Sequence, residues 1–90
     1  MQQVQLVNGI FTPSEAADVI IGLIEKKINF HKVHRLSICE GDEKENTTYD
    51  DSRISELIKE LQNAKDFISE AREQGNMLKV IGTLELEFIN

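Results

Sequence analysis

The sequence predicts an α+β fold in which N- and C-terminal strands pair antiparallel and two or three helices between them pack on one face. A period of two near the end of the chain is the first reason, since every even position from Leu78 to Phe88 is apolar or glycine and most odd positions are polar. Helical spacing of apolar residues in two long central stretches is the second. Length is the third, because 90 residues make a single domain, 1–90, whose core we expect oligomerisation to complete.

The first strand is predicted at Gln3–Val7, where Val4 and Leu6 alternate with glutamines before the turn pair Asn8-Gly9. The last strand, Met77–Ile89, is its natural antiparallel partner. It is longer than Gln3–Val7 can cover, so we expect part of its edge to stay unpaired or to meet a second subunit.

A helix is expected to begin at Pro13, because Thr12 can cap it and Glu15 can return a hydrogen bond to Thr12 as in a capping box. The helix runs to about Lys27 and carries two adjacent apolar stripes. The first comprises Ala16, Ile20, Leu23 and Lys27, and the second comprises Ala17, Ile21, Ile24 and Ile28. Such a helix needs cover on two sides, and a subunit interface is at least as economical a cover as one small sheet and one partner helix.

The middle of the chain is less clearly patterned. Residues 29–40 fit either a helical stripe or an alternating strand, and we favour a second, short helix. The segment 41–51 has no apolar periodicity, which indicates a solvated acidic loop. Its acidic residues, set against Lys44 alone, are Asp42, Glu43, Glu45, Asp50 and Asp51.

A second long helix is predicted from Ser52, because apolar residues recur three and four positions apart over three heptads. These residues are Ile54, Leu57, Leu61, Ala64, Ile68 and Ala71. Asp51 or Ser52 can cap its start, and Gly75-Asn76 can supply the left-handed residue that ends it. The stripe is therefore a packing seam for another helix.

The composition is that of a folded, acidic protein, with 40% hydrophobic and 29% charged residues. A net charge of -6 disfavours nucleic acid and anionic membranes as partners. Cys39 is the single cysteine, which rules out an internal disulfide and fits a reducing compartment. Because no basic leader or membrane-length apolar run is present, we expect a cytoplasmic location.

No spacing in the sequence specifies a reaction, so we assign no catalytic residue and no cofactor and lean towards a protein that is not an enzyme. His31 and His34 lie three apart and Cys39 follows, so a helix would place both imidazoles on one face as candidate zinc or copper ligands. The alternative is that the histidines are ordinary surface or half-buried residues and that Cys39 is a small buried hydrophobe.

Four basic residues lie in ten positions that contain no acid: Lys26, Lys27, Lys32 and Arg35. The simplest interpretation is that they balance the acidic segment 41–51, in the same chain or in another subunit. An acidic protein partner and a phosphate- or nucleic-acid-binding patch are the alternatives.

The run Asn8-Gly9-Ile10-Phe11-Thr12-Pro13-Ser14-Glu15-Ala16-Ala17, followed by Lys27-Ile28-Asn29-Phe30-His31 and Leu36-Ser37, resembles a small group of uncharacterised bacterial proteins of similar length. The resemblance implies a bacterial cytoplasmic protein with helices between terminal strands. It implies no catalytic or binding residue.

The chain carries more apolar helix surface than one small sheet can cover. We therefore expect a noncatalytic assembly or adaptor protein that forms a homo-oligomer, a dimer or higher, and works through its surface. The residues expected at its interface are Ile21, Ile24, Leu84, Leu86 and Phe88. The alternative function is a metal- or ligand-binding regulatory protein that uses His31 and His34, and the third is a small enzyme with its pocket between subunits.

Overall fold

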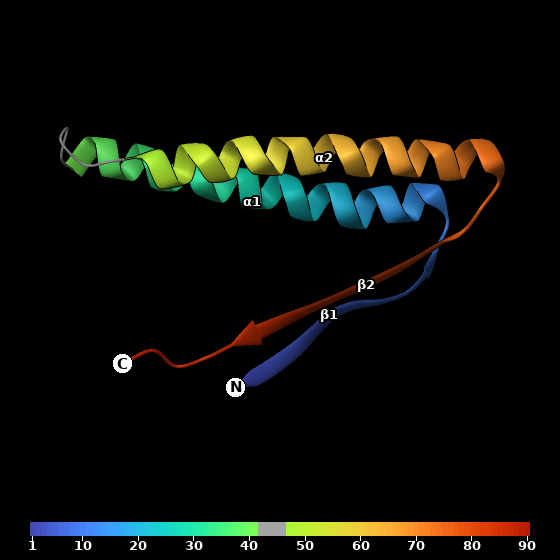
Figure 1. The fold of residues 1–90 in the computed structure, drawn as a ribbon, viewed down its shortest axis with the longest axis horizontal. Helices are drawn as coiled ribbons and strands as arrows, with labels where there is room; N and C mark the ends of the chain where they lie inside the picture. The colour runs from blue at the N-terminus through green and yellow to red at the C-terminus, as the bar shows by residue number, and fades with distance from the viewer. Residues whose placement is uncertain (42–46) are drawn as a thin grey trace.

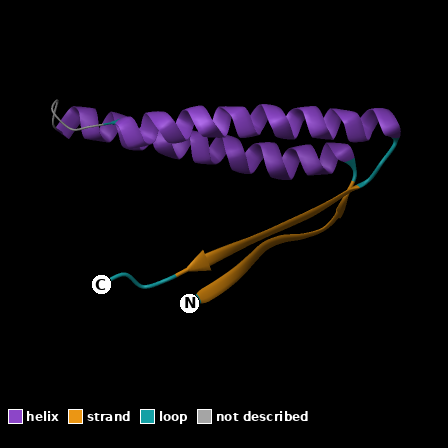
Figure 2. Ribbon diagram, in the orientation of Figure 1, coloured by secondary structure: helices purple, strands orange, loops and turns teal. Residues whose placement is uncertain are grey.

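The computed structural model describes residues 1–41 and 47–90, with side chains described for 1–38 and 47–90. The described elements, in order, are β1 (Gln2–Phe11), α1 (Pro13–Gly41), α2 (Thr48–Gln74) and β2 (Leu78–Leu86). The two strands form an antiparallel pair, and the two helices form an antiparallel hairpin (Figures 1 and 2). The predicted α+β order, with the terminal strands paired antiparallel, is confirmed.

The elements lie side by side in a flat arrangement, with α1 between α2 and the strands (Figure 1). The principal extents of the chain are 51 × 31 × 15 Å. The strands join the helices at one end of the molecule and diverge from α1 towards the other end, where both termini lie (Figure 1). The sheet therefore covers only the first part of α1.

The helices pack through two stripes with heptad spacing, which we call the seam. Its members on α1 are Ala17, Ile21, Ile24, Ile28, His31, Arg35 and Ile38, and on α2 they are Asp50, Ile54, Leu57, Leu61, Ala64, Ile68 and Ala71. Successive members alternate between four and three residues apart, as in a coiled coil, and every member is buried or half-buried. The predicted apolar stripe of the second long helix lies in this seam.

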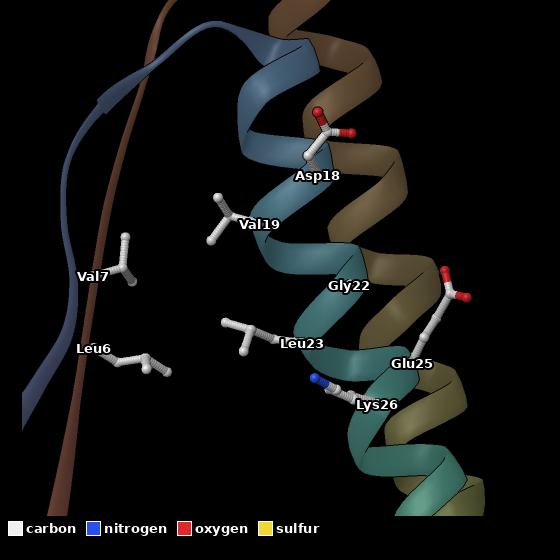
Figure 3. Close-up of a pocket in the computed structure, with 8 residues that line it drawn as sticks. All are labelled: Leu6, Val7, Asp18, Val19, Gly22, Leu23, Glu25 and Lys26. Atoms are coloured by element: carbon white, nitrogen blue, oxygen red, sulfur yellow. The ribbon is translucent and has the colours of Figure 1, made fainter.

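An irregularity in β1 keeps Val4 and Val7 on the same side of the sheet. Gln5 pairs with Thr83 and Val7 pairs with Gly82, so that Leu6 is an extra residue on β1. An extra residue shifts the alternation of side chains by one position, and Val4 and Val7 therefore face the same way although they are three apart. This inner face consists of Val4, Val7, Phe11, Leu78, Val80, Leu84 and Leu86. Leu6 points to the same side as Val7 (Figure 3).

The strand boundaries differ from the expectation. β1 continues through Asn8-Gly9 to Phe11, because Gly9 pairs with Val80 and Phe11 pairs with Leu78. β2 in turn ends at Leu86, so β1 pairs with it along its whole length. The prediction that part of the last strand's edge stays unpaired is therefore wrong.

The helices are longer than expected. α1 continues as one helix from Pro13 to Gly41, where a separate short helix had been favoured for 29–40. α2 begins at Thr48 rather than Ser52, so the end of the predicted acidic loop is helical, while residues 42–46 lie outside the described part of the chain.

The predicted capping box and helix stop are present. The backbone N–H of Thr12 donates to Glu15 Oε1 at 2.9 Å, and the N–H of Glu15 donates to Thr12 Oγ1 at 3.2 Å. Gly75 ends α2 with a φ of 71°, and its neighbour Asn76 donates its backbone N–H to the carbonyl of Ala71. The N-cap of α2 is Thr47 instead of Asp51 or Ser52, and the Thr47 hydroxyl donates to the Asp51 carboxylate at 3.0 Å.

Gly75→Ala should destabilise the fold by about 1 kcal/mol, because an L side chain is strained at positive φ. No described atom lies within 4 Å of the added Cβ, so the cost comes from the backbone alone. Gly75→Asn is the matched control and should cost less, since asparagine tolerates the left-handed conformation. Urea unfolding at one protein concentration measures both, and equal stability of wild type and Gly75→Ala would contradict the assigned helix end.

Candidate functional site

Two histidines of α1 and one aspartate of α2 form a hydrogen-bonded cluster. His31 Nδ1 lies 2.9 Å from Asp50 Oδ1, and His34 Nδ1 lies 2.8 Å from Asp50 Oδ2. His31 and Asp50 are 1% and 2% exposed, whereas the His34 side chain is 51% exposed. One carboxylate thus holds a buried and a half-exposed imidazole together.

The helical hairpin produces this cluster. His31 and Asp50 both occupy seam positions, so antiparallel packing brings them together across 19 residues of sequence. His34 follows His31 by three residues and lies on the same side of α1. Asp50 is in the first turn of α2, where the partial positive charge of a helix N-terminus favours a carboxylate.

The hydrogen bonds determine the protonation state of the cluster. The pKa of Asp50 lies below its ordinary value of 3.8, mainly because His31 donates a hydrogen bond to the carboxylate. Burial opposes this shift, and the hydrogen bond and charge of His34 add to it. An ionised carboxylate only accepts hydrogen bonds, so both Nδ1 atoms carry the hydrogen. At neutral pH, Asp50 is therefore a carboxylate that receives two N–H groups.

Aromatic rings surround the two imidazoles. The Phe30 ring stacks on His34 at 6.1 Å between centroids and meets His31 edge-on at 5.2 Å. Tyr49 approaches His31 edge-on at 5.8 Å, and Lys27 Nζ lies 4.8 Å from the centre of the Phe30 ring. These contacts fix the orientation of both histidines.

His31 Nε2 has no hydrogen-bond partner within the described residues, although it is buried. With the hydrogen on Nδ1, a neutral His31 presents a lone pair at Nε2. A buried acceptor without a donor costs stability, and the double hydrogen bonding of Asp50 offsets part of this cost.

The predicted metal site is only partly visible. His31 and His34 do lie together, but both Nδ1 atoms are directed at Asp50. No group of three histidine, cysteine, aspartate or glutamate side chains suited to a metal ion occurs in the described residues. The side chain of Cys39 lies outside them, so its role as a ligand stays a prediction.

Besides the bonds from His31 and His34 to Asp50, the basic run 26–35 contacts the acidic segment through Arg35 in the described structure. Arg35 Nη1 donates to Asp51 Oδ1 at 2.8 Å, which fits the interpretation that basic and acidic segments balance within the chain. The hydrogen bond from Arg35 is also the main cause of a lowered pKa for Asp51. Lys26 and Lys32 make no ion pair within the described residues and remain available to another molecule.

The residues predicted for an interface fall into two groups. Ile21 and Ile24 are half-buried seam positions of α1. Leu84 and Leu86 are exposed on the inner face near the free end of β2, and Phe88 follows β2 and is fully exposed. Contact of these five residues with another subunit stays a prediction.

Sequence reasoning missed Asp50, which was assigned to a solvated loop. The available signal was the heptad spacing of α2, because one more step of four residues back from Ile54 leads to Asp50. A carboxylate at an otherwise apolar seam position interrupts the hydrophobic pattern, and only the opposite helix reveals its partner.

Comparison of the chain with protein-family models, with curated proteins and with solved structures finds no match. None of the described helices combines the length and the apolar character that crossing a lipid bilayer requires.

Stability should fall as the pH drops through the lowered pKa of Asp50. The folded state favours the ionised carboxylate of Asp50. The carboxylate therefore contributes to stability above its ordinary pKa of 3.8, and this contribution is lost as Asp50 becomes protonated in the folded state. Urea unfolding between about pH 2 and pH 6 should show this loss in wild type and a smaller one in Asp50→Asn. Asp51→Asn is the matched control and should change the profile less, because the Asp51 side chain is 50% exposed. Identical profiles for wild type and Asp50→Asn would contradict the assigned hydrogen bonds.

His31→Leu should lower Tm by about 10 °C, because it leaves Asp50 buried with one fewer donor. The double variant His31→Leu/Asp50→Leu should regain much of this loss, since it replaces a buried polar pair by apolar seam residues. His34→Leu should have a smaller effect, because water can replace a half-exposed imidazole. Thermal unfolding at fixed protein concentration measures the Tm of all three variants. If the Tm change of the double variant equals the sum of the changes of the two single variants, the two side chains do not interact.

Proposed function

We propose that this protein is a noncatalytic homo-oligomeric assembly module, whose folded unit is completed by further copies of the chain. The observation that carries the proposal is an excess of surface. The accessible surface of the chain is 7069 Å², whereas a compact monomer of its mass exposes about 5,300 Å². The chain thus exposes about 1,700 Å² more than a compact protein of its size.

The dimensions of the chain support the same inference. Its radius of gyration is 16.4 Å, compared with about 12 Å for a compact domain of this length. The excess arises because the sheet diverges from α1 instead of lying along it (Figure 1). An open shape of this kind exposes surface that a compact domain would bury.

Much of the exposed surface is apolar. The described residues bury few large hydrophobic side chains, and the buried ones are Ile28, Ile54 and Ile68. Exposed large hydrophobic side chains occur on all four elements and after β2, and they include Ile10, Phe30, Val33, Phe67, Ile81, Phe88 and Ile89. Exposed large hydrophobic side chains that gather into a contiguous patch are typical of interaction surfaces.

The size of the excess fits a subunit interface. Obligate homodimers bury about 2,000–5,000 Å² in total, or about 1,000–2,500 Å² per subunit. The excess of about 1,700 Å² per chain lies within this range. The metal-binding alternative has less support, because the described part of the chain holds no three-ligand group and both histidines already bond to Asp50.

Sedimentation velocity of the purified chain at micromolar concentration should show a species of at least twice the 10.2 kDa chain mass. The midpoint of thermal unfolding should rise with protein concentration, because assembly stabilises the folded state by mass action. A folded species of 10.2 kDa at all concentrations, with an invariant midpoint, would disprove the proposed assembly.

A further inference from the structure

α1 carries a second apolar stripe on the side opposite the seam, which we call the outer stripe. Its members are Val19, Leu23, Lys26, Phe30 and Val33. They alternate between four and three residues apart, as the seam positions do, but at about 100° per residue they point away from α2. α1 therefore needs apolar cover on two opposite sides.

The sheet of the same chain covers the start of the outer stripe. Leu6 and Val7 of β1 point towards Val19 and Leu23 of α1 (Figure 3). A cleft of about 720 Å³ remains between them, and Asp18, Gly22, Glu25 and Lys26 complete its lining. The chain thus already packs its inner face on the outer stripe, but incompletely.

Further from this junction, both walls are exposed together. On α1, Phe30 and Val33 of the outer stripe are exposed. On the sheet, Leu78 and Val80 near the junction are half-buried, whereas Leu84 and Leu86 near the free end are exposed. Two complementary apolar surfaces therefore lack a cover where the strands diverge from α1 (Figure 1).

We propose that a second copy of the chain closes this gap, so that the inner face at the free end of each sheet packs on the outer stripe of the other copy's α1. This inference rests on the proposed assembly and specifies the surfaces that form it. Each copy supplies both the sheet end and the stripe, which is the self-complementary arrangement of a two-fold dimer. The packing repeats between copies the sheet-on-helix contact that β1 and α1 make within one copy.

The uncovered area favours a second copy as the occupant of the gap. Lys26 belongs to the outer stripe, and Lys27 Nζ lies over the ring of Phe30 in the same stripe, whereas Lys32 lies towards α2. Glu85 lies on the face of β2 opposite Leu84 and Leu86, together with Ile81, and Glu87 follows the strand. Packing the inner face on the other copy's α1 therefore buries Leu84 and Leu86 and leaves Glu85 on the outer face of the sheet. The surface excess of about 1,700 Å² per copy is enough for two such contacts.

Paired substitutions distinguish the proposed surfaces from others. Leu84→Glu on the inner face and Val33→Glu on the outer stripe should each raise the dimer dissociation constant at least about tenfold, because each buries a charge in an apolar contact. The matched controls are Ile81→Glu, which lies on the opposite face of β2, and Ile58→Glu, which lies on the flank of α2. Ile81 and Ile58 are 62% and 52% exposed, close to the 50% of Leu84 and the 58% of Val33. The controls should change the dissociation constant by less than about threefold.

Cross-linking tests the same contact without a buried charge. In a Cys39→Ser background, Leu84→Cys and Val33→Cys proteins are mixed and treated with a short bismaleimide. The mixture should give a cross-linked heterodimer, whereas Ile81→Cys mixed with Val33→Cys should not. A wild type that stays monomeric would disprove the proposed assembly. Suppose that the wild type assembles but only the Ile81 or Ile58 variants weaken association, or only the Ile81 mixture cross-links. Either result would overturn the proposed surfaces, and the proposed assembly would still stand.

Discussion

The two opposite apolar sides of α1 are the constraint on which the rest of the structure depends. One side packs against α2 in the seam, where every position is buried or half-buried. The other side meets the sheet only near Val19 and Leu23, because the strands then diverge from the helix (Figure 1). The hydrophobic effect favours covering both sides, and one chain covers the seam side more completely than the other. The surface excess, the cleft and the exposed end of the sheet all follow from this geometry.

The His31–Asp50 hydrogen bond has a different role within the same helix pair. An apolar seam with a regular heptad tolerates slippage by one heptad, since each level resembles the next. A histidine on one helix and a carboxylate on the other satisfy each other only when they lie at the same level, so any shifted alignment leaves both buried without a partner. The polar pair thus specifies the register of the hairpin at some cost in stability, as single polar residues do in coiled coils.

Local signals in the sequence were enough for the capping box at Thr12, the glycine stop at Gly75, the long second helix and the pairing of terminal strands. Non-local contacts decided the rest. The Asn8-Gly9 pair resembles a turn, yet Gly9 lies inside β1 opposite Val80, with the Phe11 ring close to it. The extra residue Leu6 shifts the alternation, so the apolar period of β1 does not continue past it. His31 and Asp50 interrupt the apolar pattern at seam positions, and neither sequence segment shows that the other is its partner.

The exposed sheet raises the question of what stops assembly at a small number of copies. β1 has no charged side chain between Gln2 and Phe11, and an uncharged edge strand can add further strands without limit. The irregularity at Leu6 interrupts its ladder, and Lys79 and Glu85 place charges on β2. The reciprocal packing proposed above limits growth further, because each partner occupies both the sheet end and the outer stripe of the other. No equivalent apolar pair of surfaces would then remain for a third copy, so the proposed contact would close as a dimer instead of propagating as a fibre.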